Sequence, residues 1–332
     1  MFIIENYSTA VIFCIITMLC WGSWANTQKL ATTTWRFELF YWDYVFGILI
    51  CSLIFAFTLG SNGNAGRSFL EDIAQADKDN ILSAVIGGIL FNAANILLVA
   101  AIGIAGMSVA FPVGIGLALV IGVIVNYIKN PIGNQFLLFA GVILIVIAIL
   151  INANAYRKMQ SGNKSTSTKG LLLSLIAGVL MGFFYKYVAA SMFPDFNVPE
   201  AGKLSPYTAV VFFSIGILLS NFLFNTFLMR RPLVGAPVGF KDYFKGGIKN
   251  HITGIAGGVI WCIGMSFSII ASGKAGPAIS YGLGQGATVI AALWGIFIWK
   301  EFRNAPKGTT AMLTVMLLFY IGGLGLLIYA GE

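Results

Sequence analysis

The sequence predicts an all-α membrane protein, with ten transmembrane helices arranged as two inverted five-helix repeats. Three observations support this fold class. Hydrophobic residues make up 58% of the 332-residue chain and charged residues only 10%, which excludes an ordinary soluble domain. Ten apolar segments are each long enough to cross a bilayer, which takes about 20 helical residues. A glycine-rich segment also occurs twice along the chain.

The repeated segment reads AGMSVAFPVGIG at 105–116 and AGPAISYGLGQG at 275–286. The same offset of 170 residues, without a gap, also aligns Gly87-Gly88 with Gly257-Gly258 and Phe111 with Tyr281. Glycine and alanine are common in membrane helices, so chance matches between such segments arise easily. The unbroken register and the aromatic match nevertheless favour duplication of a half-domain, a pattern found in many secondary transporters.

The ten apolar segments divide into two groups around one polar stretch. The first half, 1–155, holds the expected spans 8–28, 37–59, 81–103, 107–127 and 135–155. The second half, 170–332, holds the expected spans 170–192, 206–229, 251–272, 276–298 and 309–330. The stretch 156–169 between them is rich in Ser and Thr and is typical of a flexible linker. It lacks the G-x-x-x-x-G-K-[ST] phosphate loop, so an ATP-driven transporter is not indicated.

The basic residues predict the orientation, because Lys and Arg collect in cytoplasmic loops. Fourteen of them lie in the loops after spans one, three, five, seven and nine, and five lie in the loops on the other side. We therefore expect a cytoplasmic linker and both termini outside, in a plasma membrane or a bacterial inner membrane. Five spans per half is an odd number, so duplicated halves must have opposite orientations in the membrane.

Short connections and one proline add local expectations. The loops 103–106 and 273–276 are so short that each must join antiparallel neighbours. Pro112, in the fourth span, frees a backbone carbonyl at membrane depth. Such breaks are tolerated mainly where protein or a water-filled cavity covers them, so Pro112 predicts a cavity or a hinge, with a packed kink as the alternative.

Polar side chains near the centres of the spans are candidate substrate contacts, because they must pair or line a path in hydrocarbon. Asn92 and Asn95 lie three residues apart on one face of the third span, where they either bind a polar solute or clamp two helices together. Trp21 and Trp24 lie inside the first span, where they either stack on a planar ligand or anchor the helix. The second half adds the candidates Trp261, Tyr281 and Gln285.

Charged residues in the spans are scarcer. Glu38 and Asp43 both lie in the cytoplasmic third of the second span, where burial favours a protonatable carboxyl. Glu38 has the alternative of pairing with Arg36 at the membrane surface, so Asp43 is the preferred site of a coupling proton. Lys186 in the sixth span either contacts a substrate or extends its ammonium toward the outer surface.

Several segments resemble the ureide permease-like branch of the drug/metabolite transporter superfamily. The resemblance rests on CWGSWAN at 20–26, WRFEL at 35–39, YWDY at 41–44 and GQG at 284–286, followed by Trp294-Gly295 and WKEF at 299–302. It extends over nearly the whole chain. The central loop is shorter than in plant ureide permeases and lacks their phosphate-loop-like motif. The resemblance implies proton-coupled uptake of allantoin, uracil and related heterocycles, and related branches carry glucose or rhamnose.

The sequence thus predicts a secondary active transporter, most simply a proton symporter, that imports a small polar solute by alternating access. A sugar permease and a drug or metabolite exporter of the same superfamily are the alternatives. A membrane-embedded enzyme is not indicated, because no nucleophile, metal cluster or facing pair of carboxylates stands out at membrane depth. No cofactor and no nucleic-acid partner are expected, and His251 stands alone at a predicted helix start. The composition is compatible with a monomer or a homodimer.

Overall fold

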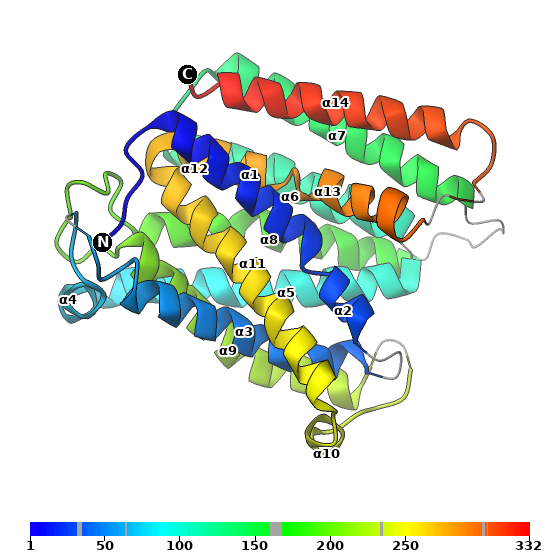
Figure 1. Cartoon of the computed structure of the whole chain (residues 1–332), viewed down its shortest axis with the longest axis horizontal. Helices are drawn as coiled ribbons and strands as arrows, with labels where there is room; N and C mark the ends of the chain where they lie inside the picture. The colour runs from blue at the N-terminus through cyan, green and yellow to red at the C-terminus, as the bar shows by residue number, and fades with distance from the viewer. Residues whose placement is uncertain are drawn as a thin grey trace.

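The computed structural model describes residues 1–31, 35–63, 65–105, 107–159, 168–232, 235–300, 303 and 305–332. These residues form helices and loops, with no strand beyond an isolated bridge between Met192 and Leu204. The helices, in chain order, are α1 (Tyr7–Ser23), α2 (Asn26–Leu30), α3 (Phe37–Phe57), α4 (Phe69–Gln75), α5 (Lys78–Ala105), α6 (Met107–Lys129), α7 (Gln135–Met159), α8 (Thr168–Ser191), α9 (Pro206–Arg230), α10 (Phe240–Phe244), α11 (Ile248–Ala275), α12 (Pro277–Gly284), α13 (Ala287–Leu293), the π-helix η1 (Trp294–Ile298) and α14 (Thr309–Tyr329). Figure 1 shows the long helices packed into one bundle.

Within the described residues, nine helices are long and apolar enough to cross a membrane, where the sequence predicts ten. The difference concerns the fourth expected span, 107–127. Helix α6 covers it with 23 residues, but the described apolar part is the shorter segment Val113–Lys129. The side chains of Phe111 and Pro112 lie outside the described ones, as do Gly106 and linker residues 160–167. The predicted hinge or kink at Pro112 therefore stays a prediction.

Two of the expected spans are interrupted along their length. The first divides into α1 and α2 at Trp24-Ala25, and the ninth divides into α12, α13 and η1, with its first break at Gln285-Gly286. Two indole N–H groups hold the ends of these spans together: Trp294 donates to the Ser23 hydroxyl (2.8 Å) and Trp299 to the side-chain Oδ1 of Asn26 (2.6 Å). Both tryptophans belong to the family-like segments of the sequence.

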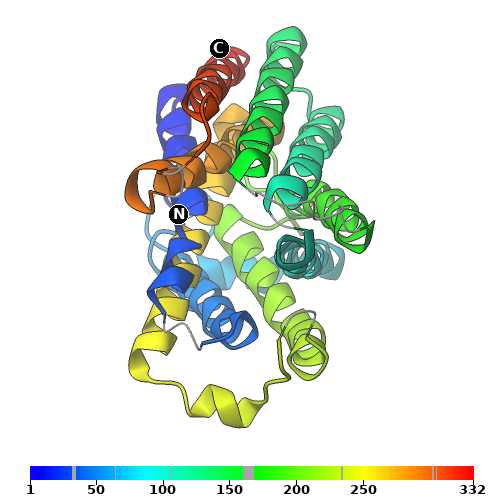
Figure 2. The same ribbon diagram turned by 90° about the vertical axis from the view of Figure 1, so that its right-hand side faces the viewer.

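The helices of the two predicted halves are interleaved. Helix α5 packs against α8 and α9, and its counterpart in the second half, α11, packs against α1 and α3. In the same way α6 packs against α8 while α12 and α13 pack against α1, and α7 packs against α14. Figures 1 and 2 show α7 and α14 side by side along one edge of the bundle. These principal contacts of one predicted half thus have counterparts in the other.

The closest helix crossings lie at glycines that the repeat aligns. A Cβ atom at Gly258 in α11 would overlap the carbonyl oxygen of Tyr44 in α3, and one at Gly88 in α5 would overlap that of Phe213 in α9. Glycine at such a crossing lets two helix backbones approach closely, which is a common way to pack membrane helices. The repeated glycines therefore mark where α5 and α11, the two long hairpin helices, cross helices of the other predicted half.

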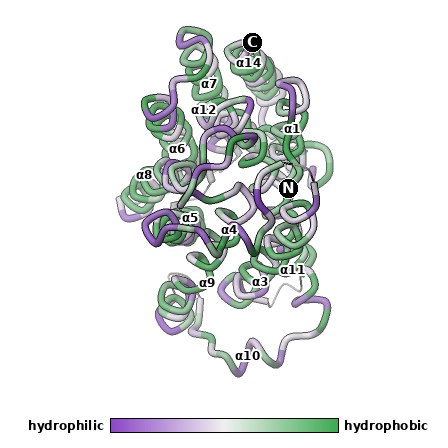
Figure 3. Tube along the Cα trace, turned by 90° about the vertical axis from the view of Figure 1, so that its left-hand side faces the viewer, coloured by the Kyte–Doolittle hydropathy of each residue, from purple (hydrophilic) through white to green (hydrophobic). Residues whose placement is uncertain are grey.

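Hydrophobic residues predominate along the helices, as the colouring of the chain trace in Figure 3 shows. Large exposed side chains include Phe136 (85%), Leu223 (69%) and Ile321 (67%). The interior, in contrast, buries carboxamides and hydroxyls such as those of Asn92 and Ser268. An apolar exterior around a partly polar interior is the arrangement that a bilayer requires.

Candidate functional site

An aromatic cluster occupies the centre of the bundle, around Trp261 of α11. Trp21 of α1 stacks on it with ring centroids 5.8 Å apart, and its indole N–H donates to the Trp261 carbonyl (3.2 Å). Phe91 of α5 and Phe213 of α9 lie against Trp261 at 4.4 and 5.9 Å. The structure thus brings predicted site residues from both halves together, as aromatic neighbours from four helices.

Tyr44 of α3 connects the second predicted tryptophan to this cluster. Its ring lies 4.6 Å from Trp24 and 6.5 Å from Trp261. Tyr44 is fully buried, yet its hydroxyl has no hydrogen-bond partner among the described residues. A buried hydroxyl without a partner is costly, so this group is a candidate contact for a bound molecule. Tyr44 was not among the residues expected to contact a solute, although the YWDY segment contains it.

Asn92 and Asn95 of α5 both contact Tyr41 of α3. The Tyr41 hydroxyl donates to Asn92 Oδ1 (2.9 Å), and Asn95 Nδ2 donates to that same hydroxyl (3.1 Å). Asn92 Nδ2 also donates to the hydroxyl of Ser220 in α9 (2.9 Å). Asn92 therefore links α3, α5 and α9, which is the interhelical clamp that the sequence left open. The Tyr41 ring stacks on Tyr44 at 5.3 Å, so this polar group borders the aromatic cluster.

Tyr281 and Gln285 lie on α12 and at its end. Tyr281 packs against Gly122 of α6, and its hydroxyl donates to the carbonyls of Ala118 (3.2 Å) and Met181 (3.1 Å). These bonds hold Tyr281 in place, so its predicted role in stacking on a ligand competes with a packing role. The Gln285 side chain, 7% exposed at the break between α12 and α13, makes no hydrogen bond to a described residue.

Asp43 lies in a polar cluster that the sequence did not predict. Its carboxylate accepts a 2.6 Å hydrogen bond from the Tyr243 hydroxyl of α10 and contacts His251 Nδ1 of α11 at 3.0 Å. Burial raises the pKa of Tyr243, and its hydrogen bond to Asp43 raises it further, so the phenol remains a donor. Asp43 itself is only 2% exposed. The expectation that His251 stands alone was wrong, because its Nδ1 contacts the Asp43 carboxylate. The two residues are 208 positions apart in the sequence, so this contact could not be read from their spacing.

Glu38 is engaged in a different contact. Its carboxylate accepts two hydrogen bonds from the Arg36 guanidinium, through Nε (3.1 Å) and Nη2 (2.5 Å). A two-point contact of this kind is the charge-assisted geometry typical of an Arg guanidinium and a carboxylate. The structure therefore contains the surface pair that the sequence offered as the alternative for Glu38, about one and a half helical turns from Asp43.

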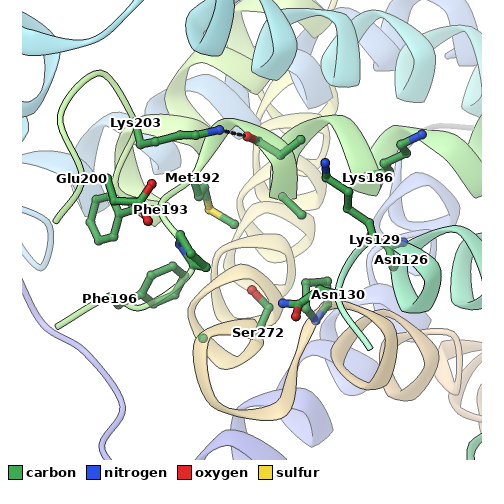
Figure 4. Close-up of a pocket in the computed structure, with 15 residues that line it drawn as sticks. Asn126, Lys129, Asn130, Lys186, Met192, Phe193, Phe196, Glu200, Lys203 and Ser272 are labelled. Atoms are coloured by element: carbon green, nitrogen blue, oxygen red, sulfur yellow. Dashed lines mark hydrogen bonds between the residues drawn. The ribbon is translucent and has the colours of Figure 1, made fainter. Parts of the chain in front are cut away.

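A cavity of about 330 Å³ lies at the opposite end of the bundle, where α6, α8 and α11 end (Figure 4). Its lining includes Lys186, whose place the sequence left open, together with Lys129, Lys203 and Glu200. It lies apart from the aromatic cluster, and the two are separate candidate sites.

Comparison with known proteins gives consistent results over the whole chain. A family model described as "Ureide permease" matches residues 40–167 and 154–330. Ureide permease 1 of Arabidopsis thaliana is 24% identical and ureide permease 4 is 22% identical, with at least 96% of each chain covered. The glucose uptake protein GlcU of Bacillus subtilis is 26% identical over 70% of this chain and 74% of its own. A solved crystal structure with 15% identity matches 97% of both chains with a TM-score of 0.61, which supports the fold.

Proposed function

The chain belongs to the ureide permease family, and from this premise we propose that it imports a small ureide-type solute such as allantoin, or a related heterocycle such as uracil. The observation that carries the proposal is the family match, which extends over both halves of the chain. Relatives named ureide permeases are similar over nearly their full length. A transporter rather than an enzyme is the activity that this family name describes.

The aromatic cluster suits such a solute. Ureides and pyrimidinediones are flat and have amide edges, which stack on indole and phenol rings and pair with carboxamides. We assign the stacking faces to Trp21, Trp24 and Trp261. The polar groups we assign to the solute are the Tyr44 hydroxyl, the Gln285 carboxamide and the Oδ1 of Asn95, whose Nδ2 is bonded to Tyr41. Asn92 and Tyr281 hold the surrounding helices.

Alternating access follows from the organisation in halves. The matched contacts of the two halves support an inverted repeat, with halves 1–155 and 170–332 rocking around the aromatic cluster. The interruption of the ninth span at Gln285-Gly286 gives a point at which that span can bend beside the cluster. The distribution of Lys and Arg supports a cytoplasmic linker and outward-facing termini.

We assign proton coupling to Asp43 together with His251. A carboxylate–imidazole pair with a 3.0 Å contact shares a proton readily, and Tyr243 holds the carboxylate in place. The contact joins α3, α10 and α11, so a change in protonation alters how these elements hold together. Glu38 is the weaker candidate because the Arg36 guanidinium already neutralises it.

Uptake into proteoliposomes tests the proposal directly. Purified protein is reconstituted, an inward proton gradient is imposed, and uptake of radiolabelled allantoin and uracil is compared with that of glucose and rhamnose. We expect gradient-dependent uptake of the heterocycles and little uptake of the sugars. Uptake of a sugar instead would favour the branch that GlcU represents. Uptake of none would leave export, the remaining alternative, to be tested with inverted gradients.

A further inference from the structure

The cavity at the outer end of the bundle, which we call the lysine cavity, is built from both halves of the chain. Helix α6 contributes Asn126 and its last residue, Lys129, the following residue Asn130 also lines the cavity, and α8 contributes Lys186. The loop from α8 to α9 contributes Glu200 and Lys203. In Figure 4 the lysines lie above Asn130 and Ser272 of α11, with Phe193 and Phe196 to one side.

The positive charge of the lysine cavity is not balanced. Its lining holds three lysines and one glutamate, a formal excess of two positive charges. Lys203 donates to the carbonyl of Ala190 near the end of α8 (2.6 Å) and so has a structural role there. Lys129 and Lys186 make no hydrogen bond or ion pair with any residue that the structure describes, and Glu200 forms no ion pair with them.

Helix geometry explains Lys129 but not Lys186. A cation in the last turn of a helix is stabilised by the carbonyl end of the helix dipole, and Lys129 is the last residue of α6. The last turn of α8 contains no basic residue, because Lys186 lies further back. Lys186 as a residue is partly exposed, and no described carboxylate pairs with its ammonium. An anion bound in the lysine cavity would supply the missing partner.

The remaining lining indicates the kind of anion. Phe193, Phe196 and Met192 give the lysine cavity an apolar wall, which suits a carbon skeleton rather than an inorganic ion. Asn126 uses its Nδ2 on the Gly122 carbonyl (2.7 Å), so its Oδ1 is available to accept a hydrogen bond. A volume of about 330 Å³ is at the lower end of the range for small-molecule sites.

A hydrogen-bonded layer lies between the lysine cavity and the aromatic cluster. Tyr185, next to Lys186, bonds through its hydroxyl to Ser268 Oγ (3.0 Å), and Ser268 Oγ contacts Ser280 Oγ at 3.1 Å. Ser268 is one helical turn before Ser272, which lines the cavity. All of these hydroxyls are buried and have hydrogen-bond partners.

We propose that the lysine cavity is a binding site for small organic carboxylates at the outer face of the protein, with Lys186 and Lys129 as the carboxylate contacts. The site is distinct from the aromatic cluster, and its occupancy does not depend on which solute is transported. A carboxylate between two ammonium groups gains charge-assisted hydrogen bonds, and the aromatic wall covers its carbon chain.

Isothermal titration calorimetry on the detergent-purified full chain tests this site with succinate and its neutral isostere succinamide. We expect succinate to bind, more weakly as salt is added, and succinamide not to bind. Lys186→Gln and Lys129→Gln should each weaken succinate binding about ten-fold, the usual order for losing a hydrogen bond to a charged group. Lys186→Arg, which keeps the positive charge, should bind succinate about as well as the wild type. The matched control is Lys78→Gln, which removes a lysine at the same end but outside the cavity and should leave binding unchanged.

Three results would overturn the proposal. Equal binding of succinate and succinamide would show that charge is not recognised. Equal succinate affinities of Lys186→Gln and Lys78→Gln would place the anion elsewhere, provided that thermal unfolding shows both variants to be folded. Succinate binding that is lost in nanodiscs containing phosphatidylglycerol, but present in those with phosphatidylcholine alone, would assign the site to a lipid headgroup. The calorimetry involves no transport, so its failure is distinguishable from failure of ureide uptake.

Discussion

At the residue scale, two neighbouring tyrosines of α3 have different roles. The Tyr41 hydroxyl is bonded to both carboxamides of α5, whereas the Tyr44 hydroxyl, one turn away, is buried without a described partner. A satisfied buried hydroxyl stabilises the helix packing, and an unsatisfied one weakens it unless a ligand supplies the bond. The two positions therefore separate stability from substrate binding.

Replacing each tyrosine by phenylalanine tests this difference. Tyr41→Phe should lower the free energy of unfolding by about 1–3 kcal/mol, because it leaves Asn92 and Asn95 with unpaired polar atoms. Tyr44→Phe should leave stability unchanged or slightly higher, while solute uptake falls several-fold through a raised KM. Thermal unfolding in detergent and uptake kinetics in proteoliposomes provide the two readouts. Wild-type KM in Tyr44→Phe would remove that hydroxyl from the binding site.

The Asp43 cluster gives a second prediction at this scale. Asp43→Asn cannot take up and release the coupling proton, so proton-driven uptake should fall to background while solute exchange between loaded and empty vesicles persists. His251→Gln should reduce driven uptake in the same direction. Asp79→Asn, at an exposed position in the first turn of α5, is the control. Full proton-driven uptake by Asp43→Asn would exclude this carboxyl from coupling.

At the element scale, the two long hairpin helices are positioned by close backbone crossings. Gly258 of α11 lies against α3, and Gly88 of α5 lies against α9, at positions that the repeat aligns. In both cases the nearest atom is a backbone carbonyl oxygen, which cannot move away as the end of a flexible side chain can. The crossings therefore depend on the absence of a side chain.

Alanine at either glycine should separate the helices that cross there. We expect Gly258→Ala and Gly88→Ala each to lower the free energy of unfolding by about 1–3 kcal/mol through overpacking. Gly325→Ala in α14 is the matched control, because a Cβ there meets no atom within 4 Å. That change should be neutral or stabilising by up to about 1 kcal/mol. Equal unfolding temperatures for all three variants would refute the steric argument.

At the scale of the whole molecule, helices of the two predicted halves, 1–155 and 170–332, are interleaved. Helices α5 and α11 each pack mainly on helices of the opposite half. Without that half, neither helix would have most of its packing neighbours. The site clusters reflect this organisation, since the aromatic cluster, the Asp43 cluster and the lysine cavity each draw residues from both halves.

The predicted orientation in the membrane can be tested with two cysteine substitutions at exposed positions. Asn62→Cys lies after α3, and Lys245→Cys lies between α10 and α11, at opposite ends of the bundle. In intact cells a membrane-impermeant maleimide should label Asn62→Cys, and Lys245→Cys should react only after permeabilisation. Three native cysteines are buried, and a Cys20→Ser background removes the partly accessible fourth. The reverse labelling pattern would invert the predicted orientation.

The sequence alone determined the helices, their approximate ends and the transporter class. Apolar length, polar loops and glycine spacing are local properties, so they remain readable without the fold. It also indicated Trp21, Trp24, Trp261 and Asp43 as candidates, because aromatic and charged residues at membrane depth are unusual wherever they pack.

Only the tertiary structure decided which of these residues meet. It paired Asp43 with His251 and Asn92 with Tyr41, left the Tyr44 hydroxyl without a described partner, and placed Lys186 in a cavity. These facts depend on contacts between residues tens to hundreds of positions apart. Periodicity and composition carry no information about such contacts, because the crossing of helices, rather than the sequence within any one helix, sets the neighbours of a side chain.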